Sequence, residues 1–149
     1  MSSIRQATPQ DADAIAELTR IAYTKWVPVI GGKPRPMTVD YRLAVTSHRF
    51  DLLLAEADLA GLIETVAEHD CLLIENVAVH PDFQGRGFGR ALMAHAQRLA
   101  ADAGLGRIRL YTNKMFDVNI QLYRSLGFVI DHEEALDDAT LVHMSKGLS

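Results

Sequence analysis

Residues 77 to 90 read Val-Ala-Val-His-Pro-Asp-Phe-Gln-Gly-Arg-Gly-Phe-Gly-Arg, a hydrophobic strand that turns into a glycine-spaced loop and then a helix. Because Gly85, Gly87 and Gly89 lack a Cβ atom, the backbone can adopt φ > 0 and aim several consecutive N–H groups at one anion. The helix that starts here adds the positive end of its dipole. The sequence therefore predicts a phosphate cradle.

The loop differs from two better-known phosphate motifs. The pattern G-x-x-x-x-G-K-[ST] requires a lysine that this loop lacks. The pattern G-x-G-x-x-G is not matched either, because Gly87 is followed by Gly89 and then by Arg90, where the third glycine would have to stand. A phosphoryl-transfer enzyme would also need Mg²⁺-binding residues, which the chain does not offer in a recognisable pattern. A different phosphate-bearing ligand is expected.

Two segments carry a resemblance to a known family. Gln84-x-x-Gly87-x-Gly89, after the strand 77–79 and Pro81, resembles the acetyl-coenzyme A loop [QR]-x-x-G-x-[GA] of the GNAT acetyltransferase superfamily. Downstream, Asn-Ile-Gln-Leu-Tyr-Arg-Ser-Leu-Gly-Phe at 119–128 is similar to a second segment of that family. The resemblance covers residues 50–146 firmly and the first 49 residues in outline.

The expected fold is α/β of the α+β layered kind, with one acetyltransferase domain over 1–149. It has a mixed, mainly antiparallel GNAT-like sheet of six to seven strands with helices on both faces. The resemblance implies that the sheet is splayed open between the strands ending at Val79 and Thr112, and that acetyl-CoA, the cosubstrate, binds in this splay.

Patterning and turn residues predict the individual elements. Helices are expected from a Thr8-Pro9 cap to Tyr23, from a Thr38 cap to Thr46, from the glycine loop to Ala103, and over 117–126. Strands are expected over 4–7, 51–56, 59–66, 71–79, 107–112, 128–132 and 140–145. Residues 27–37 hold two glycines and three prolines and indicate a shaped loop.

The resemblance assigns the cofactor contacts. The Val77 or Val79 amide would polarise the thioester carbonyl, and the Asn119 amide would bind the pantetheine arm. Arg86 and Arg90 either pair with phosphates or are solvated helix charges. The complete set is Val77, Ala78, Val79, Gln84, Gly85, Arg86, Gly87, Phe88, Gly89, Arg90 and Asn119.

Glu75 is the candidate general base, because it interrupts an otherwise apolar strand and a buried charge needs a reason. Strand alternation predicts that Glu75, Val77 and Val79 share one face. The position resembles the base of the spermidine/spermine acetyltransferases, acting directly or through a water. The alternative is a carboxylate that faces water or pairs with Arg107 or Arg109.

Tyr123 follows Asn119 by one helical turn, so the two side chains share a face. By resemblance the Tyr123 hydroxyl protonates the departing CoA thiolate. The alternative is a core tyrosine whose hydroxyl bonds to the backbone.

The expected acceptor is an amine of a small molecule, although the sequence does not identify it or exclude a protein side chain. Tyr23, Trp26, Tyr111, Tyr41 and the 31–37 loop are the candidate walls, with Trp26 equally compatible with the core. The branch that acetylates protein N-termini is disfavoured, because it carries a carboxylate where Tyr111 stands. The rival from another class is a non-catalytic CoA-binding regulatory or sensor domain.

Composition narrows the remaining classes. A formal charge of −4 disfavours nucleic acid as a partner. No signal peptide or membrane-length apolar run is present, and the single cysteine, Cys71, fits a reducing compartment, so a cytoplasmic protein without a membrane partner is expected. The histidines show no metal-ligand spacing, and no metal is expected. The oligomeric state is left open, with a homodimer as one option.

Overall fold

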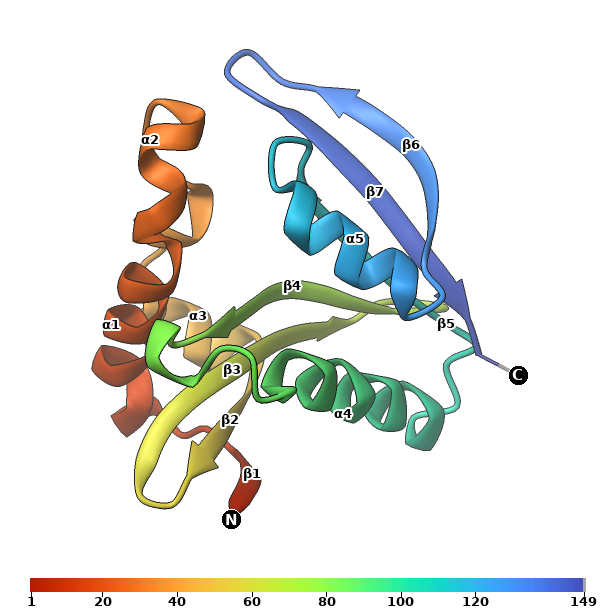
Figure 1. The fold of residues 1–149 in the computed structure, drawn as a ribbon. Helices are drawn as coiled ribbons and strands as arrows, with labels where there is room; N and C mark the ends of the chain where they lie inside the picture. Colours follow the sequence, from red (N-terminus) through yellow and green to blue (C-terminus); the bar gives the residue numbers. More distant parts are fainter. Residues whose placement is uncertain (149) are drawn as a thin grey trace.

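The computed structural model describes residues 1 to 148, and its strands form one mixed sheet (Figure 1). Within these residues seven strands lie in the order β1-β2-β3-β4-β5-β7-β6. They are β1 (Ser2–Gln6), β2 (Arg49–Ala55), β3 (Asp58–Ala67), β4 (Leu72–Val79), β5 (Arg107–Asn113), β6 (Val129–Ala135) and β7 (Thr140–Gly147). Only the β4–β5 pair is parallel. The predicted mixed, mainly antiparallel sheet is confirmed.

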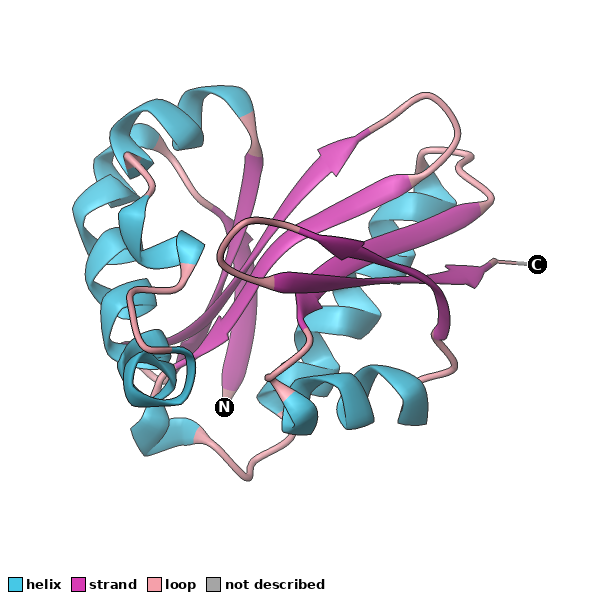
Figure 2. Cartoon of the chain, turned by 90° about the horizontal axis from the view of Figure 1, so that it is seen from above, coloured by secondary structure: helices cyan, strands magenta, loops and turns pink. Residues whose placement is uncertain are grey.

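Helices cover both faces of the sheet, as predicted (Figure 2). They are α1 (Ala12–Tyr23), α2 (Val27–Ile30), α3 (Tyr41–Ser47), α4 (Phe88–Asp102) and α5 (Asp117–Ser125). On one face, Ile15 of α1 packs in a buried cluster with Leu62 of β3. On the other face, Leu92 of α4 packs with Ile63 and with Tyr123 of α5. Neighbouring β3 residues thus point into separate cores, as a strand requires.

Two expectations for the first third of the chain were wrong. Residues 27–37, expected to be a loop, contain α2 and a 3₁₀ turn over Arg35–Thr38. Thr38 does not cap α3, because its hydroxyl donates to the Arg35 carbonyl at 2.8 Å. Asp40 is the cap instead, and its carboxylate accepts from the Arg42 N–H at 3.1 Å.

A register shift interrupts the β3–β4 pairing beside Glu75. Glu64 pairs with Asn76 and Thr65 pairs with Ile74, so Glu75 is an extra residue on β4. The expected alternation, with Glu75 on the face of Val77 and Val79, was therefore wrong. Val77 packs in the α4-side core together with Ile74, whereas Glu75 and Asn76 line a cavity apart from Val77.

Gly61 lets α4 approach β3 closely. A Cβ atom at Gly61 would lie 3.1 Å from the Ala78 carbonyl oxygen and 3.1 Å from Leu92 Cδ1. We predict that Gly61→Ala lowers the free energy of unfolding by about 1–3 kcal/mol, because the backbone oxygen cannot move away easily. Urea unfolding measures this. Gly106→Ala is the control, since nothing lies within 4 Å of its added Cβ, and an equal loss in both variants would contradict the packing argument.

Candidate functional site

The β4 and β5 strands separate after a short contact and open the sheet. They pair only over Leu72–Ile74 and Ile108–Leu110, while β5 stays paired with β7 along its whole length. The His80 N–H donates to Ala60 on β3 at 2.8 Å. Because successive residues of a strand point their backbone groups to opposite sides, Val79 and Val77 point theirs into the opening. The splay predicted from the sequence is present.

The glycine loop presents free backbone donors at the same opening. Gly85 and Gly87 both have φ of +79°, in the left-handed region that favours glycine. The first backbone bond of α4 is Ala91 N–H to the Gly87 carbonyl at 3.0 Å. Within residues 1–148, the N–H groups of residues 85–90 have no acceptor. This arrangement can bind an anion at the helix start.

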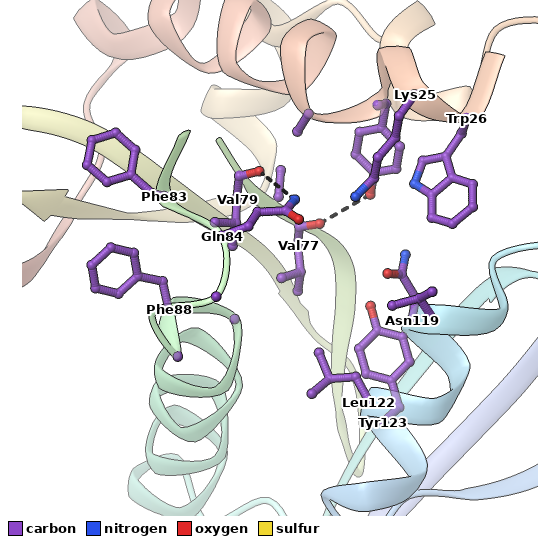
Figure 3. Close-up of a pocket in the computed structure, with 17 residues that line it drawn as sticks. Lys25, Trp26, Val77, Val79, Phe83, Gln84, Phe88, Asn119, Leu122 and Tyr123 are labelled. Carbon is purple, nitrogen blue, oxygen red and sulfur yellow. Dashed lines mark hydrogen bonds between the residues drawn. The ribbon is translucent and has the colours of Figure 1, made fainter. Parts of the chain in front are cut away.

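A cavity of about 280 Å³, here called the cleft cavity, lies between this loop, the β4 edge, α5 and the end of α1. Figure 3 shows Asn119 and Tyr123 pointing into it from α5, opposite Val77. The other expected cofactor contacts that line it are Ala78, Val79, Gln84, Gly85, Gly87, Phe88 and Gly89. Arg86 and Arg90 do not: Arg86 lies over the Phe83 ring and Arg90 bonds to Ser125 at 3.2 Å.

Tyr123 is 9% exposed, and burial alone raises its pKa to about 12. Among the described residues its hydroxyl has no hydrogen-bond partner, so the backbone bond of a core tyrosine is not made. The side chain is held by packing with Phe128, with ring centroids 6.2 Å apart. Tyr123 therefore presents a protonated hydroxyl to the cleft cavity.

A second cavity of about 360 Å³, the tyrosine cavity, lies beside the first and is lined by Tyr23, Tyr41 and Tyr111. Glu75 also lines it and accepts a hydrogen bond from the Tyr111 hydroxyl. Burial, followed by this bond, raises the pKa of Tyr111, so it stays a donor. The alternative partners of Glu75 are otherwise engaged: Arg109 pairs with Glu68 at 2.7 Å and Arg107 with Asp131 at 3.5 Å.

Tyr23 stands where the two cavities meet and lines both. Its hydroxyl donates to Asn76 Oδ1 at 2.7 Å and lies 3.2 Å from the Val77 carbonyl oxygen. Trp26, expected as an acceptor wall, lines the cleft cavity and stacks on Phe116 with centroids 4.4 Å apart. Of the other expected acceptor walls, Tyr41 and residues 31–36 line the tyrosine cavity.

Sequence reasoning missed Glu64 and His48, which also line the tyrosine cavity. Glu64 is 3% exposed, and its Oε2 lies 2.6 Å from His48 Nδ1. Burial raises the pKa of Glu64, and the hydrogen bond to His48 opposes that rise. The sequence could have indicated Glu64, because this residue interrupts an apolar strand in the same way as Glu75. Its contact with His48 depends on the tertiary structure and has no counterpart in the sequence pattern.

No group of three or more His, Cys, Asp or Glu side chains in residues 1–148 is placed to hold a metal ion. No helix in that part of the chain combines the length and apolar character needed to cross a bilayer.

Comparisons with known proteins agree with this geometry. The model of the Acetyltransferase (GNAT) family matches residues 13–128. Streptothricin acetyltransferase of Streptomyces lavendulae is 36% identical over 84 residues, which are 55% of this chain and 44% of that protein. Mycothiol acetyltransferase of Nocardiopsis dassonvillei is 41% identical over 76 residues, 50% of this chain and 22% of that protein. The match thus spans less than half the length of either relative.

A solved structure supports the fold over the whole chain. The ribosomal-protein-S18-alanine N-acetyltransferase from Escherichia coli superposes with a TM-score of 0.80 at 22% identity. The superposition covers 100% of this chain and 95% of that one.

Proposed function

The chain belongs to the GNAT acetyltransferase family, and from this premise we propose that it transfers an acetyl group from acetyl-CoA to a primary amine of a small-molecule acceptor. One observation carries the proposal: the two cavities meet at Tyr23, one lined by free backbone donors and the other by Glu75. Cofactor and acceptor can therefore approach each other from opposite sides. The small-molecule class is supported by the relatives, whose names specify streptothricin and mycothiol.

The cleft cavity fits acetyl-CoA through donors that the chain leaves unused. The N–H groups of residues 85–90 would hold the pyrophosphate, with the helix dipole of α4 adding to the attraction. The Asn119 amide would bind the pantetheine arm, and the Val77 or Val79 N–H would donate to the thioester oxygen. Bound there, acetyl-CoA supplies an activated acyl group. Arg86 and Arg90 could bind the phosphates only if their side chains left their present contacts with Phe83 and Ser125.

The acceptor amine requires a base. An alkylammonium with a pKa near ~10.4 is neutral in only about one molecule in 10³ at pH 7. Glu75 would accept its proton, directly or through a water, while Tyr111 holds the carboxylate through one hydrogen bond. Tyr123 would donate its proton to the departing sulfur, and its raised pKa keeps that proton in place until it is needed.

The experiment that tests the proposal measures acetyl-CoA binding and amine-dependent CoA release on one preparation, against a panel of small amines. Release that depends on the amine supports the transferase. The rival, a CoA-binding regulatory domain, predicts binding with no release for any amine.

Gly87→Val should abolish acetyl-CoA binding and leave the fold intact. The protein places nothing within 4 Å of a Cβ at this position, but its φ of +79° is strained for valine. The branched side chain would also stand where the phosphates approach. Calorimetric titration with acetyl-CoA measures the loss, and circular dichroism checks the fold. An undiminished acetyl-CoA affinity in this variant would contradict the assignment of the glycine loop as the phosphate-binding site.

Glu75→Gln should lower kcat by about 10²-fold or more at neutral pH, with little change in acetyl-CoA affinity. The loss should shrink as the pH approaches the pKa of the amine, because the amine then loses its proton unaided. The pH dependence of kcat measures this. Glu68→Gln, which changes a carboxylate paired with Arg109 outside both cavities, is the control. An unaffected rate in Glu75→Gln would require another base.

Tyr123→Phe should lower the rate of acetyl transfer by roughly 10² to 10⁴ while acetyl-CoA binding survives, because only the acidic hydroxyl is removed. With a pKa raised to about 12, Tyr123 stays protonated at neutral and moderately alkaline pH. The wild-type rate should therefore show no alkaline decline from this group below about pH 11. Single-turnover rates and binding should be measured together. Weaker binding with an unchanged chemical rate would rule out the general-acid role.

A further inference from the structure

The floor of the tyrosine cavity carries two carboxylates from adjacent strands. Glu64 on β3 pairs with Asn76, and Glu75 is the extra residue next to Asn76 on β4. Both carboxylates line the cavity, so the register shift places them on one face. Cross-strand neighbours of this kind have Cβ atoms roughly 5–8 Å apart. The transfer reaction proposed above uses Glu75 and leaves Glu64 without a task.

Burying the Glu64 carboxylate costs free energy, because the charged group loses its hydration. Glu64 is 3% exposed, and its ion-pair partner is His48. A lysine or arginine in that place would form a stronger charge-assisted hydrogen bond. His48 engages Oε2 at 2.6 Å, and no described residue donates to Oε1. Burial raises the pKa of the carboxyl. A buried carboxylate with an unused oxygen beside a cavity can be satisfied by a cation that enters the cavity.

The cavity walls suit an organic cation. Tyr23, Tyr41, Tyr111 and Phe116 contribute aromatic rings, whose faces attract ammonium groups. Lys33 and Arg35 also line the cavity and are exposed, as is Asp138 from the loop between β6 and β7. The lining thus combines the buried Glu64 and the half-buried Glu75 with exposed charges of both signs. A cationic group that reaches Glu64 and Glu75 meets complementary charge there.

We propose that the acceptor carries two cationic groups a short aliphatic chain apart, with the reacting amine at Glu75 and the second cation bound by Glu64. His48 is a positioning residue that fixes the Glu64 carboxylate through Oε2 and leaves Oε1 facing the ligand. Glu64 thereby determines specificity for diamines over monoamines. This inference rests on the proposed acetyl transfer and deepens it by naming the acceptor class.

The test compares three probes of one length: terminal diaminopentane, pentylamine and ω-aminopentanoate. Calorimetry with the chain of residues 1–149 gives their affinities in the presence of CoA, and CoA release from acetyl-CoA gives kcat/KM. For the wild type we expect the diamine to exceed the monoamine by on the order of 10- to 100-fold in both measurements, the range of one charge-assisted contact. The aminopentanoate should be the poorest probe.

Glu64→Gln should reduce the diamine-to-monoamine ratio to near one, and Glu64→Asp, which keeps the charge, should retain part of the preference. Glu133→Gln is the matched control, because Glu133 lies on β6 outside the cavity and pairs with Lys114. It should leave the ratio unchanged. Thermal unfolding and acetyl-CoA affinity of each variant confirm that it is folded.

The outcomes separate this inference from the proposed function. Acetylation of amines with no diamine preference, or a preference that survives Glu64→Gln, would overturn the role of Glu64 and leave the transferase standing. A preference for ω-aminopentanoate would also overturn it and assign recognition to Lys33 or Arg35. Diamine binding that requires Glu64 but gives no CoA release with any amine would support the cation site and overturn acetyl transfer.

Discussion

The short parallel contact between β4 and β5 is the constraint on which both cavities depend. After three paired residues the strands are drawn apart, because β4 stays with β3 and β5 stays with β7. An unpaired strand edge inside a protein must satisfy its polar groups in another way. Here the Tyr23 hydroxyl and the Gln84 amide reach the Val77 and Val79 carbonyl oxygens, at 3.2 and 3.5 Å. The corresponding N–H groups remain available to a ligand.

Tyr23 connects the helical layer to this opening. It is the last residue of α1, and its hydroxyl bonds across to Asn76 at 2.7 Å. Burial raises its pKa well above the usual value, so it acts as a fixed donor at the boundary between the cavities. The Trp26–Phe116 stack closes the same boundary from the side of α5. The position of α1 therefore sets the boundary between the two cavities.

The extra residue in β4 gives the tyrosine cavity its charge. In a strand with unbroken alternation, Glu75 would lie on the face of Val77 and compete for space with the α4-side core. With the extra residue, Glu75 lies on the same floor as Glu64, under aromatic walls. Bulges of this kind redirect side chains near active sites. The register shift thus brings two carboxylates to the lining of one cavity.

The sequence by itself determined the family, and the resemblance to that family implied the mixed sheet and the splay. Local chemistry predicted many residues of the cleft cavity, because the glycines at 85, 87 and 89 free the backbone and Asn119 and Tyr123 are one helical turn apart. Arg86 and Arg90 were expected there too, but they do not line it. What the sequence could not decide depends on pairing between distant segments. The register of β3 against β4 moved Glu75 to the other cavity, and it brought Glu64 beside it.

Tertiary packing alone also decided the partners of single side chains. Trp26 reached the cleft cavity because Phe116, 90 positions later, offers it a ring to stack on. His48 became the partner of Glu64 because β2, which begins at the next residue, pairs with β3 so that Phe50 lies opposite Glu64. Strand alternation and helical spacing describe neighbours within one element. They carry no information about a register shift or a contact between elements, since those are set by the free energy of the whole packed core.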